Sequence, residues 1–213
     1  MERKFVEMKR EDMKRNKELN KLMNKVNKVT SKKYKLSKKD YMLFLVKQDI
    51  IYLFFPAARI RESDLKAEIS VKITYKPLWT DDLLWDILGM PANKDEPMSL
   101  RAVGAFTACE MKIAEYTIIL DAEDELTVQR TLDEQAEHFL SVIGDYNDER
   151  YRKQLLSSEL YKAESSLVFI HEKKYDEARK LLSESKGNGG FIVGGKSYKE
   201  LALEYINNRK EIR

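Results

Sequence analysis

The sequence has a single cysteine, Cys109, among its 213 residues, so no disulfide can form within the chain. Its longest apolar runs, 41–46 and 50–56, are far shorter than the roughly 20 residues that a membrane-spanning helix needs. The basic N-terminus is followed by neither an apolar stretch nor a small-residue cleavage site, which argues against a secretory signal. These absences predict a cytoplasmic protein without a membrane partner.

Metal ligands at recognised spacings are also lacking. The two histidines, His138 and His171, are 33 residues apart, and neither has a Cys, Asp or Glu at a ligand spacing. The acidic stretch 121–125 lacks the glycine and the spacing of a calcium loop. Cys109 has no evident histidine partner, which favours a core thiol over a nucleophile. We therefore predict no metal, no cofactor and no catalytic residue.

Charge is abundant but unevenly distributed. Charged residues make up 35% of the chain and apolar residues 43%, a composition typical of a globular protein. Residues 1–39 contain 15 Lys and Arg against 5 Asp and Glu, a net charge of +10, whereas the whole chain carries +3. The basic character therefore belongs to one N-terminal segment.

This segment has the pattern of an amphipathic helix. Residues 5–32 contain no Gly or Pro, and Leu19, Leu22, Val26 and Val29 recur at steps of three and four. Clustered cations on the other faces could neutralise phosphates. The candidate nucleic-acid-binding residues are Lys9, Arg10, Lys14, Arg15, Lys21, Lys25 and Lys28. The alternative is that these side chains face solvent or the acidic remainder of the chain.

The middle of the chain has strand patterns. Runs 41–46 and 50–55 are rich in aromatic and β-branched residues and predict a hairpin, and 67–75 alternates with a period of two, as expected for a strand with one wet face. A short helix over 81–88 with Thr80 as N-cap, a loop over 90–98, an extended segment over about 100–120 and a helix over 128–143 follow. We predict an α+β fold: an antiparallel sheet of about four strands, with a leading basic helix and flanking helices.

The C-terminal part contains helical patterns alone. We predict an α+β domain over 1–145 and a helical region over 146–213, with a glycine-rich linker over 187–195, where five of the eight glycines fall. Within it, 163–182 resembles one tetratricopeptide helical hairpin, because a small alanine would let two helices approach closely. Such arrays need about three copies to stand alone, so we expect this hairpin to pack on the sheet domain or on a partner.

The order of elements, from the leading helix through the lysine-rich aromatic stretch 33–41 to a meander and a helical end, resembles an uncharacterised class of bacterial α+β domains. The resemblance spans about residues 15 to 185 and carries no diagnostic motif. It implies a fold and no functional residue.

Two short motifs resemble enzyme sites. Gly190, Gly195, Lys196 and Ser197 match the spacing of a phosphate-binding P-loop. A P-loop follows a strand and needs a later acidic residue for its metal, whereas here a helix precedes the match and 16 residues follow it. We therefore interpret the match as a mobile linker that leads to a last helix with Ser197 as its N-cap.

The second motif is Glu110-Met111-Lys112, which with an earlier Asp95 matches the metal-binding core of many nucleases. The alternative is a solvated strand face with Glu110 and Lys112 side by side. None of these motifs forms a convincing set of catalytic residues. We therefore predict a non-catalytic protein that binds another macromolecule, with a protein as the expected partner. Nucleic acid is the alternative partner, through the basic helix, and a metal-dependent nuclease is the weaker alternative.

Overall fold

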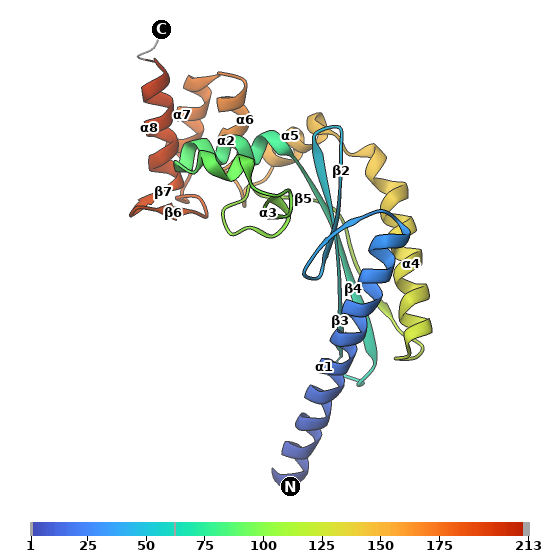
Figure 1. The fold of residues 1–213 in the computed structure, drawn as a ribbon. Coiled ribbons are helices and arrows are strands. Elements are labelled where there is room, and N and C mark those ends of the chain that lie inside the picture. The colour runs from blue at the N-terminus through green and yellow to red at the C-terminus, as the bar shows by residue number, and fades with distance from the viewer. Residues whose placement is uncertain (1, 62, 211–213) are drawn as a thin grey trace. The chain divides into compact units, whose positions relative to one another are not determined.

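The chain folds as the α+β protein that the sequence predicts (Figure 1). This computed structural model describes residues 2–61 and 63–210, with side chains described from residue 11 to residue 209. Its main sheet has five strands rather than about four. In chain order the elements are α1 (Glu2–Lys33), β1 (Ser37–Lys39), β2 (Met42–Lys47), β3 (Ile50–Ile60), β4 (Ala67–Pro77), α2 (Leu78–Leu88), the 3-10 helix η1 (Pro91–Asp95), α3 (Ser99–Val103), β5 (Met111–Ile119), α4 (Glu125–Val142), the 3-10 helix η2 (Ile143–Asp145), α5 (Asp148–Leu156), α6 (Ser166–His171), α7 (Tyr175–Glu184), β6 (Ile192–Val193), β7 (Lys196–Ser197) and α8 (Tyr198–Lys210).

The chain forms two compact units that interleave along the sequence. Unit 1 comprises Met1–Leu45, Tyr52–Thr74 and Lys112–Asp145, and unit 2 comprises Val46–Ile51, Tyr75–Met111 and Tyr146–Arg213. The expected boundary after residue 145 coincides with one border of these units. Two earlier stretches, 46–51 and 75–111, group with the C-terminal helices.

The strands follow one another in the sheet in the order β1-β2-β3-β4-β5. The first pair is antiparallel, with Ser37 opposite Phe44. The predicted hairpin is confirmed: β2 and β3 are joined through Gln48 and Asp49, whose φ angles are 52° and 57°. Two consecutive positive φ angles characterise the tight turn that suits the twist of paired strands.

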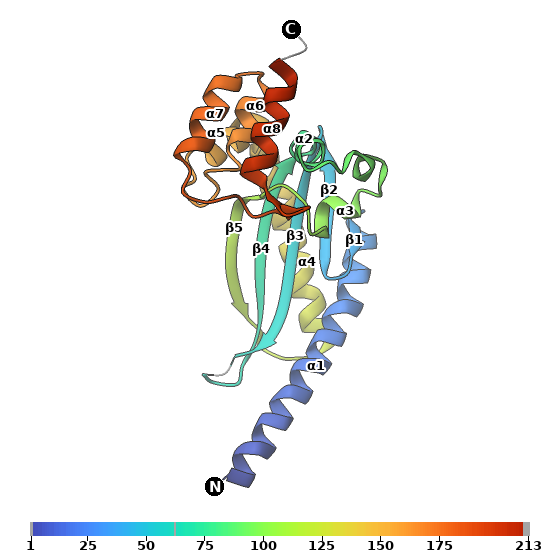
Figure 2. The same ribbon diagram turned by 90° about the vertical axis from the view of Figure 1, so that its left-hand side faces the viewer.

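The core of unit 1 lies between the sheet and two helices. Helices α1 and α4 lie side by side against one face of the sheet (Figures 1 and 2). Leu19, Met23 and Val26 of α1 are buried, as their spacing predicts, and the ring of Phe54 on β3 stacks on Phe139 of α4 with centroids 5.4 Å apart. The basic helix is therefore docked along its apolar face.

The wet face expected for strand 67–75 is only partly present. Ser70 is half-buried and Lys72 is exposed, but Glu68 is buried. Arg59, on the neighbouring strand, donates to the Glu68 carboxylate at 2.5 Å while its own side chain stays exposed. The arginine covers the carboxylate, so Glu68 is buried although the alternating pattern places it on the solvent-facing side of the strand.

Unit 2 has a helical core to which α2, α6, α7 and α8 contribute. Its buried residues are Leu84, Ile87, Leu88, Ala108, Ala163, Leu167, Ile170, Ala178, Leu182, Tyr198, Ala202 and Ile206. The predicted helical hairpin over 163–182 is present as α6 and α7, with Ala163 and Ala178 buried. None of the helices in the described part of the chain combines the length and the apolar character needed to cross a bilayer.

Two expected element boundaries are wrong. Helix α2 begins at Leu78, so Thr80 lies in its first turn and donates its hydroxyl to the Pro77 carbonyl at 2.6 Å instead of capping the helix. The extended segment expected over about 100–120 is a strand only over Met111–Ile119, because residues 99–103 form α3. Arg101 of α3 donates to the Leu78 carbonyl at 3.0 Å, so a tertiary contact accompanies the helical turn.

Candidate functional site

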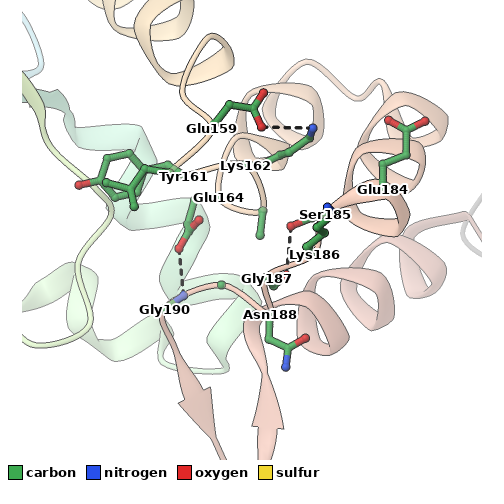
Figure 3. Close-up of a pocket in the computed structure, with 13 residues that line it drawn as sticks. Glu159, Tyr161, Lys162, Glu164, Glu184, Ser185, Lys186, Gly187, Asn188 and Gly190 are labelled. Carbon is green, nitrogen blue, oxygen red and sulfur yellow. Dashed lines mark hydrogen bonds and ion pairs between the residues drawn. The ribbon is translucent and has the colours of Figure 1, made fainter.

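A cleft of about 670 Å³ opens in unit 2 between two segments, 159–164 and 184–190 (Figure 3). The first segment connects α5 to α6, and the second runs from the end of α7 into the glycine-rich stretch. Side chains and backbone groups of both segments line the cleft.

The Glu164 side chain is the buried charge of this cleft. It is only 8% exposed, and its Oε1 accepts a hydrogen bond from the Gly190 backbone N–H at 2.9 Å, toward which it points in Figure 3. The turn that carries it is fixed by Ser165, whose hydroxyl contacts the carbonyls of Leu155 at 2.7 Å and Tyr161 at 2.9 Å. A carboxylate with this little water contact requires partners, and the backbone N–H is one of them.

The rim of the cleft combines apolar and charged groups. Leu160 is 81% exposed and presents an apolar side chain at the rim. Lys162 pairs with Glu159 at 3.5 Å, so these two charges compensate each other. Glu184, at the end of α7, is exposed. Lys186 is exposed as well, and Lys199 Nζ donates to the Ser185 carbonyl at 3.2 Å just past the end of α7. Three carboxylates against two ammonium groups leave the lining with a net charge of −1, which favours a cationic group.

The glycine-rich wall contains a turn and the β6–β7 hairpin within the stretch whose composition predicts a flexible linker. Gly189 has φ 76°, and a Cβ atom there would lie 2.8 Å from the Tyr198 Cβ. Strands β6 and β7 pair antiparallel through a turn at Gly194 and Gly195, whose φ angles are 57° and 81°. The Phe191 ring lies 6.5 Å from the Tyr198 ring. Gly189, Gly194 and Gly195 adopt positive φ angles, which a residue without a Cβ atom adopts without strain.

The P-loop match has a structural explanation in this hairpin. Ser197 Oγ accepts from the Glu200 N–H at 3.4 Å, and the Glu200 carboxylate accepts from the Ser197 N–H at 2.8 Å, which is a capping box at the start of α8. The expected N-cap is therefore confirmed. Lys196 pairs with Glu204 at 2.7 Å. The lysine and serine of the match thus hold α8, and no parallel sheet supports a phosphate loop in the described residues.

The candidate cations of α1 divide into two groups. Arg15 pairs with Glu123 and donates to the Leu65 carbonyl, and Lys25 pairs with Glu125 at 2.5 Å. By contrast Lys14, Lys21 and Lys28 are exposed and have no ion pair within the described side chains. The side chains of Lys9 and Arg10 lie outside the described residues. The sequence reasoning omitted Lys17 and Lys32, which helical spacing places beside the unpaired group.

The nuclease candidates do not form a metal centre. Asp95 ends η1, Glu110 precedes β5, and Lys112 pairs with Glu115 at 3.1 Å. Across the described part of the chain, no group of three or more His, Cys, Asp or Glu side chains could hold a metal ion. The geometry therefore gives no support to metal-dependent cleavage.

The remaining reactive or aromatic side chains have structural contacts. Burial raises the pKa of the Cys109 thiol to about 12, so it stays protonated at neutral pH and is a poor nucleophile. Trp85 is fully buried, and Trp79 stacks on His171 at 4.2 Å. Burial and, next, the Arg152 guanidinium lower the pKa of His171. These residues anchor α2, α5 and α6.

We compared the chain with protein-family models, curated proteins and solved structures, and no match was found in any of them. The resemblance to bacterial α+β domains therefore stays a prediction. Any functional proposal must come from the geometry of the described residues.

Proposed function

We propose that this chain is a non-catalytic binding protein whose cleft between residues 159–164 and 184–190 takes a segment of a partner protein. The observation that carries the proposal is the pairing, on one short turn, of a highly exposed leucine with a buried carboxylate, Leu160 and Glu164. Covering an exposed apolar side chain and pairing a desolvated carboxylate with a partner cation each contribute favourably to binding at a protein interface.

The chemistry of the cleft defines the partner segment. A Lys or Arg side chain entering between the two walls would approach the Glu164 carboxylate and the carbonyl end of α7. An apolar residue next to it would cover Leu160, which contributes roughly 1–2 kcal/mol by removing that side chain from water. The cleft volume of about 670 Å³ is in the usual range for a binding pocket and would admit one or two side chains.

A peptide-display selection against the immobilised full chain tests this proposal. We expect enriched peptides to contain Lys or Arg adjacent to an apolar residue. Two variants probe the cleft: Leu160→Asp removes the apolar anchor, and Glu164→Gln keeps an acceptor for Gly190 while removing the charge. Each should weaken binding of the enriched peptides by about tenfold or more, a loss of about 1.4 kcal/mol.

The chain offers a matched control. Leu126 on α4 is 80% exposed, almost the same as Leu160, and lies in unit 1. Leu126→Asp should leave the affinity unchanged, and all three variants should retain the parental melting temperature. Peptides that bind Leu160→Asp and Glu164→Gln as tightly as the parent chain would contradict the proposal, as would a selection that enriches nothing.

A further inference from the structure

Five lysines of α1 form one continuous charged surface, here called the lysine stripe: Lys14, Lys17, Lys21, Lys28 and Lys32. We propose that the lysine stripe is a docking surface for the phosphate backbone of duplex nucleic acid. This inference is independent of the cleft in unit 2, because every residue of the stripe belongs to unit 1.

The stripe follows from helical spacing. At 3.6 residues per turn, the five positions project within about 60° of one another around the α1 axis. The buried side chains Leu19, Met23 and Val26 project about 170° away, so the docked face and the lysine stripe are opposite. Eighteen steps of 1.5 Å make the stripe about 27 Å long. All five side chains are exposed.

Within residues 11–33, the lysine stripe is the part of α1 whose charge is least compensated. The other α1 cations whose side chains are described are paired: Arg15 with Glu123, Lys25 with Glu125 and Lys33 with Asp133. These pairs use the acidic residues at and before α4. None of the five stripe lysines has an ion pair with a described side chain.

Two carboxylates, Glu11 and Glu18, border the stripe by helical spacing and are exposed. Five cations thus face solvent against two anions, along a rigid rod already docked on the sheet. Such a surface attracts a polyanion, and its affinity falls steeply with salt.

Duplex nucleic acid fits the stripe better than other polyanionic partners. A duplex presents one negative charge per about 1.7 Å of its axis, so 27 Å of helix would face about eight base pairs. A single strand binds largely through base stacking on aromatic side chains, and residues 11–33 contain no aromatic residue. A membrane-surface helix inserts its apolar face, whereas the apolar face of α1 is buried against the protein.

The stripe supplies position and charge but no base recognition. Lysine ammonium groups act as point charges on phosphates and lack the paired donors by which arginine reads guanine. We therefore expect binding that is independent of sequence and strongly dependent on salt.

The test is a salt titration of the full chain with a fluorescent duplex of mixed sequence, followed by anisotropy between about 50 and 300 mM salt. Five phosphate contacts predict that the logarithm of the association constant falls with the logarithm of salt with a slope of about −4.5. The variant Lys17→Gln, Lys21→Gln, Lys28→Gln should reduce the slope to about −1.8 and weaken binding at the lowest salt by tenfold or more.

A matched triple variant, Lys112→Gln, Lys153→Gln, Lys174→Gln, removes the same net charge from lysines outside α1 and should keep the parental slope. Equal slopes for the two triple variants, or no binding at the lowest salt, would overturn the proposal. Stronger binding to anionic phospholipid vesicles or to a single strand than to the duplex would also overturn it. The Glu164→Gln variant should bind the duplex normally, so failure here is distinct from failure of the cleft proposal.

Discussion

Lys76 and Asp81 show how single side chains hold unit 2 together. Both are fully buried, and Lys76 Nζ donates to Asp81 Oδ1 at 3.0 Å and to the Ala108 carbonyl at 3.3 Å. The Ala108 N–H donates to the same carboxylate oxygen at 2.7 Å. The other oxygen, Oδ2, has no hydrogen bond, and the nearest Arg101 nitrogen is 3.9 Å away. Burial raises the pKa of Asp81, and the Lys76 cation opposes this effect.

Replacing one member of this pair should be costly. Asp81→Asn leaves the Lys76 ammonium buried without its counter-charge, so the free energy of unfolding should fall by about 3–5 kcal/mol in chemical denaturation. The double variant Lys76→Met, Asp81→Leu removes both charges and should lose less than Asp81→Asn alone. A control is Asp82→Asn, which breaks a partly exposed pair with Arg101 and should cost about 1 kcal/mol or less. A smaller loss for Asp81→Asn than for Asp82→Asn would refute this account.

Residue burial was only partly predictable from the sequence. The burial of the apolar face of the basic helix was predictable, because Leu19 and Val26 repeat at helical spacing. The burial of Lys76 was not predictable: its charge partner Asp81 is five residues away, but its second acceptor is the Ala108 carbonyl, 32 residues away. Local spacing cannot indicate a charge whose partner lies on a distant segment. The same reason separates paired Arg15 from unpaired Lys14 on the basic helix.

The glycine-rich element of the cleft is defined by backbone geometry. Composition predicted a flexible linker over 187–195, because glycine has no Cβ atom and can adopt many backbone conformations. In the structure these glycines serve different needs: Gly189 approaches Tyr198 closely, and Gly194 and Gly195 turn the β6–β7 hairpin. The sequence feature that indicates the hairpin is the glycine pair Gly194-Gly195, which lies between a short apolar segment and a short polar one. The same glycines belong to the P-loop match, which points to a different interpretation.

Two glycine substitutions within this element should have different effects on the free energy of unfolding. Gly189→Ala places a Cβ atom 2.8 Å from the Tyr198 side chain at a φ of 76°, so it should lower the free energy of unfolding by about 1–3 kcal/mol. Gly187→Ala meets no atom within 4 Å and should be neutral or stabilise by up to about 1 kcal/mol. Thermal melts of the two variants measure the difference. Equal melting temperatures would indicate that the loop is as mobile as its composition suggests.

For the whole molecule, the α+β class and the antiparallel sheet were predictable because strand and helix periods are local. Which residues belong to each of the two compact units was not predictable. Residues 75–111 read as the continuation of the sheet domain, yet they belong to the compact unit of the C-terminal helices. Periodicity gives the face of a helix that is buried but does not name the element that buries it.

This interleaving predicts how the chain behaves when it is cut. Helix α2 contributes Leu84, Ile87 and Leu88 to the core that it shares with α6, α7 and α8, so a fragment of residues 146–213 lacks one wall of its own core. We expect this fragment alone to melt without a cooperative transition, because apolar surface normally covered by α2 stays in water. Adding a peptide of residues 75–111 should increase the helical circular dichroism signal and restore a cooperative melt. A sharp, two-state melt of 146–213 by itself would show that the helical region folds without α2.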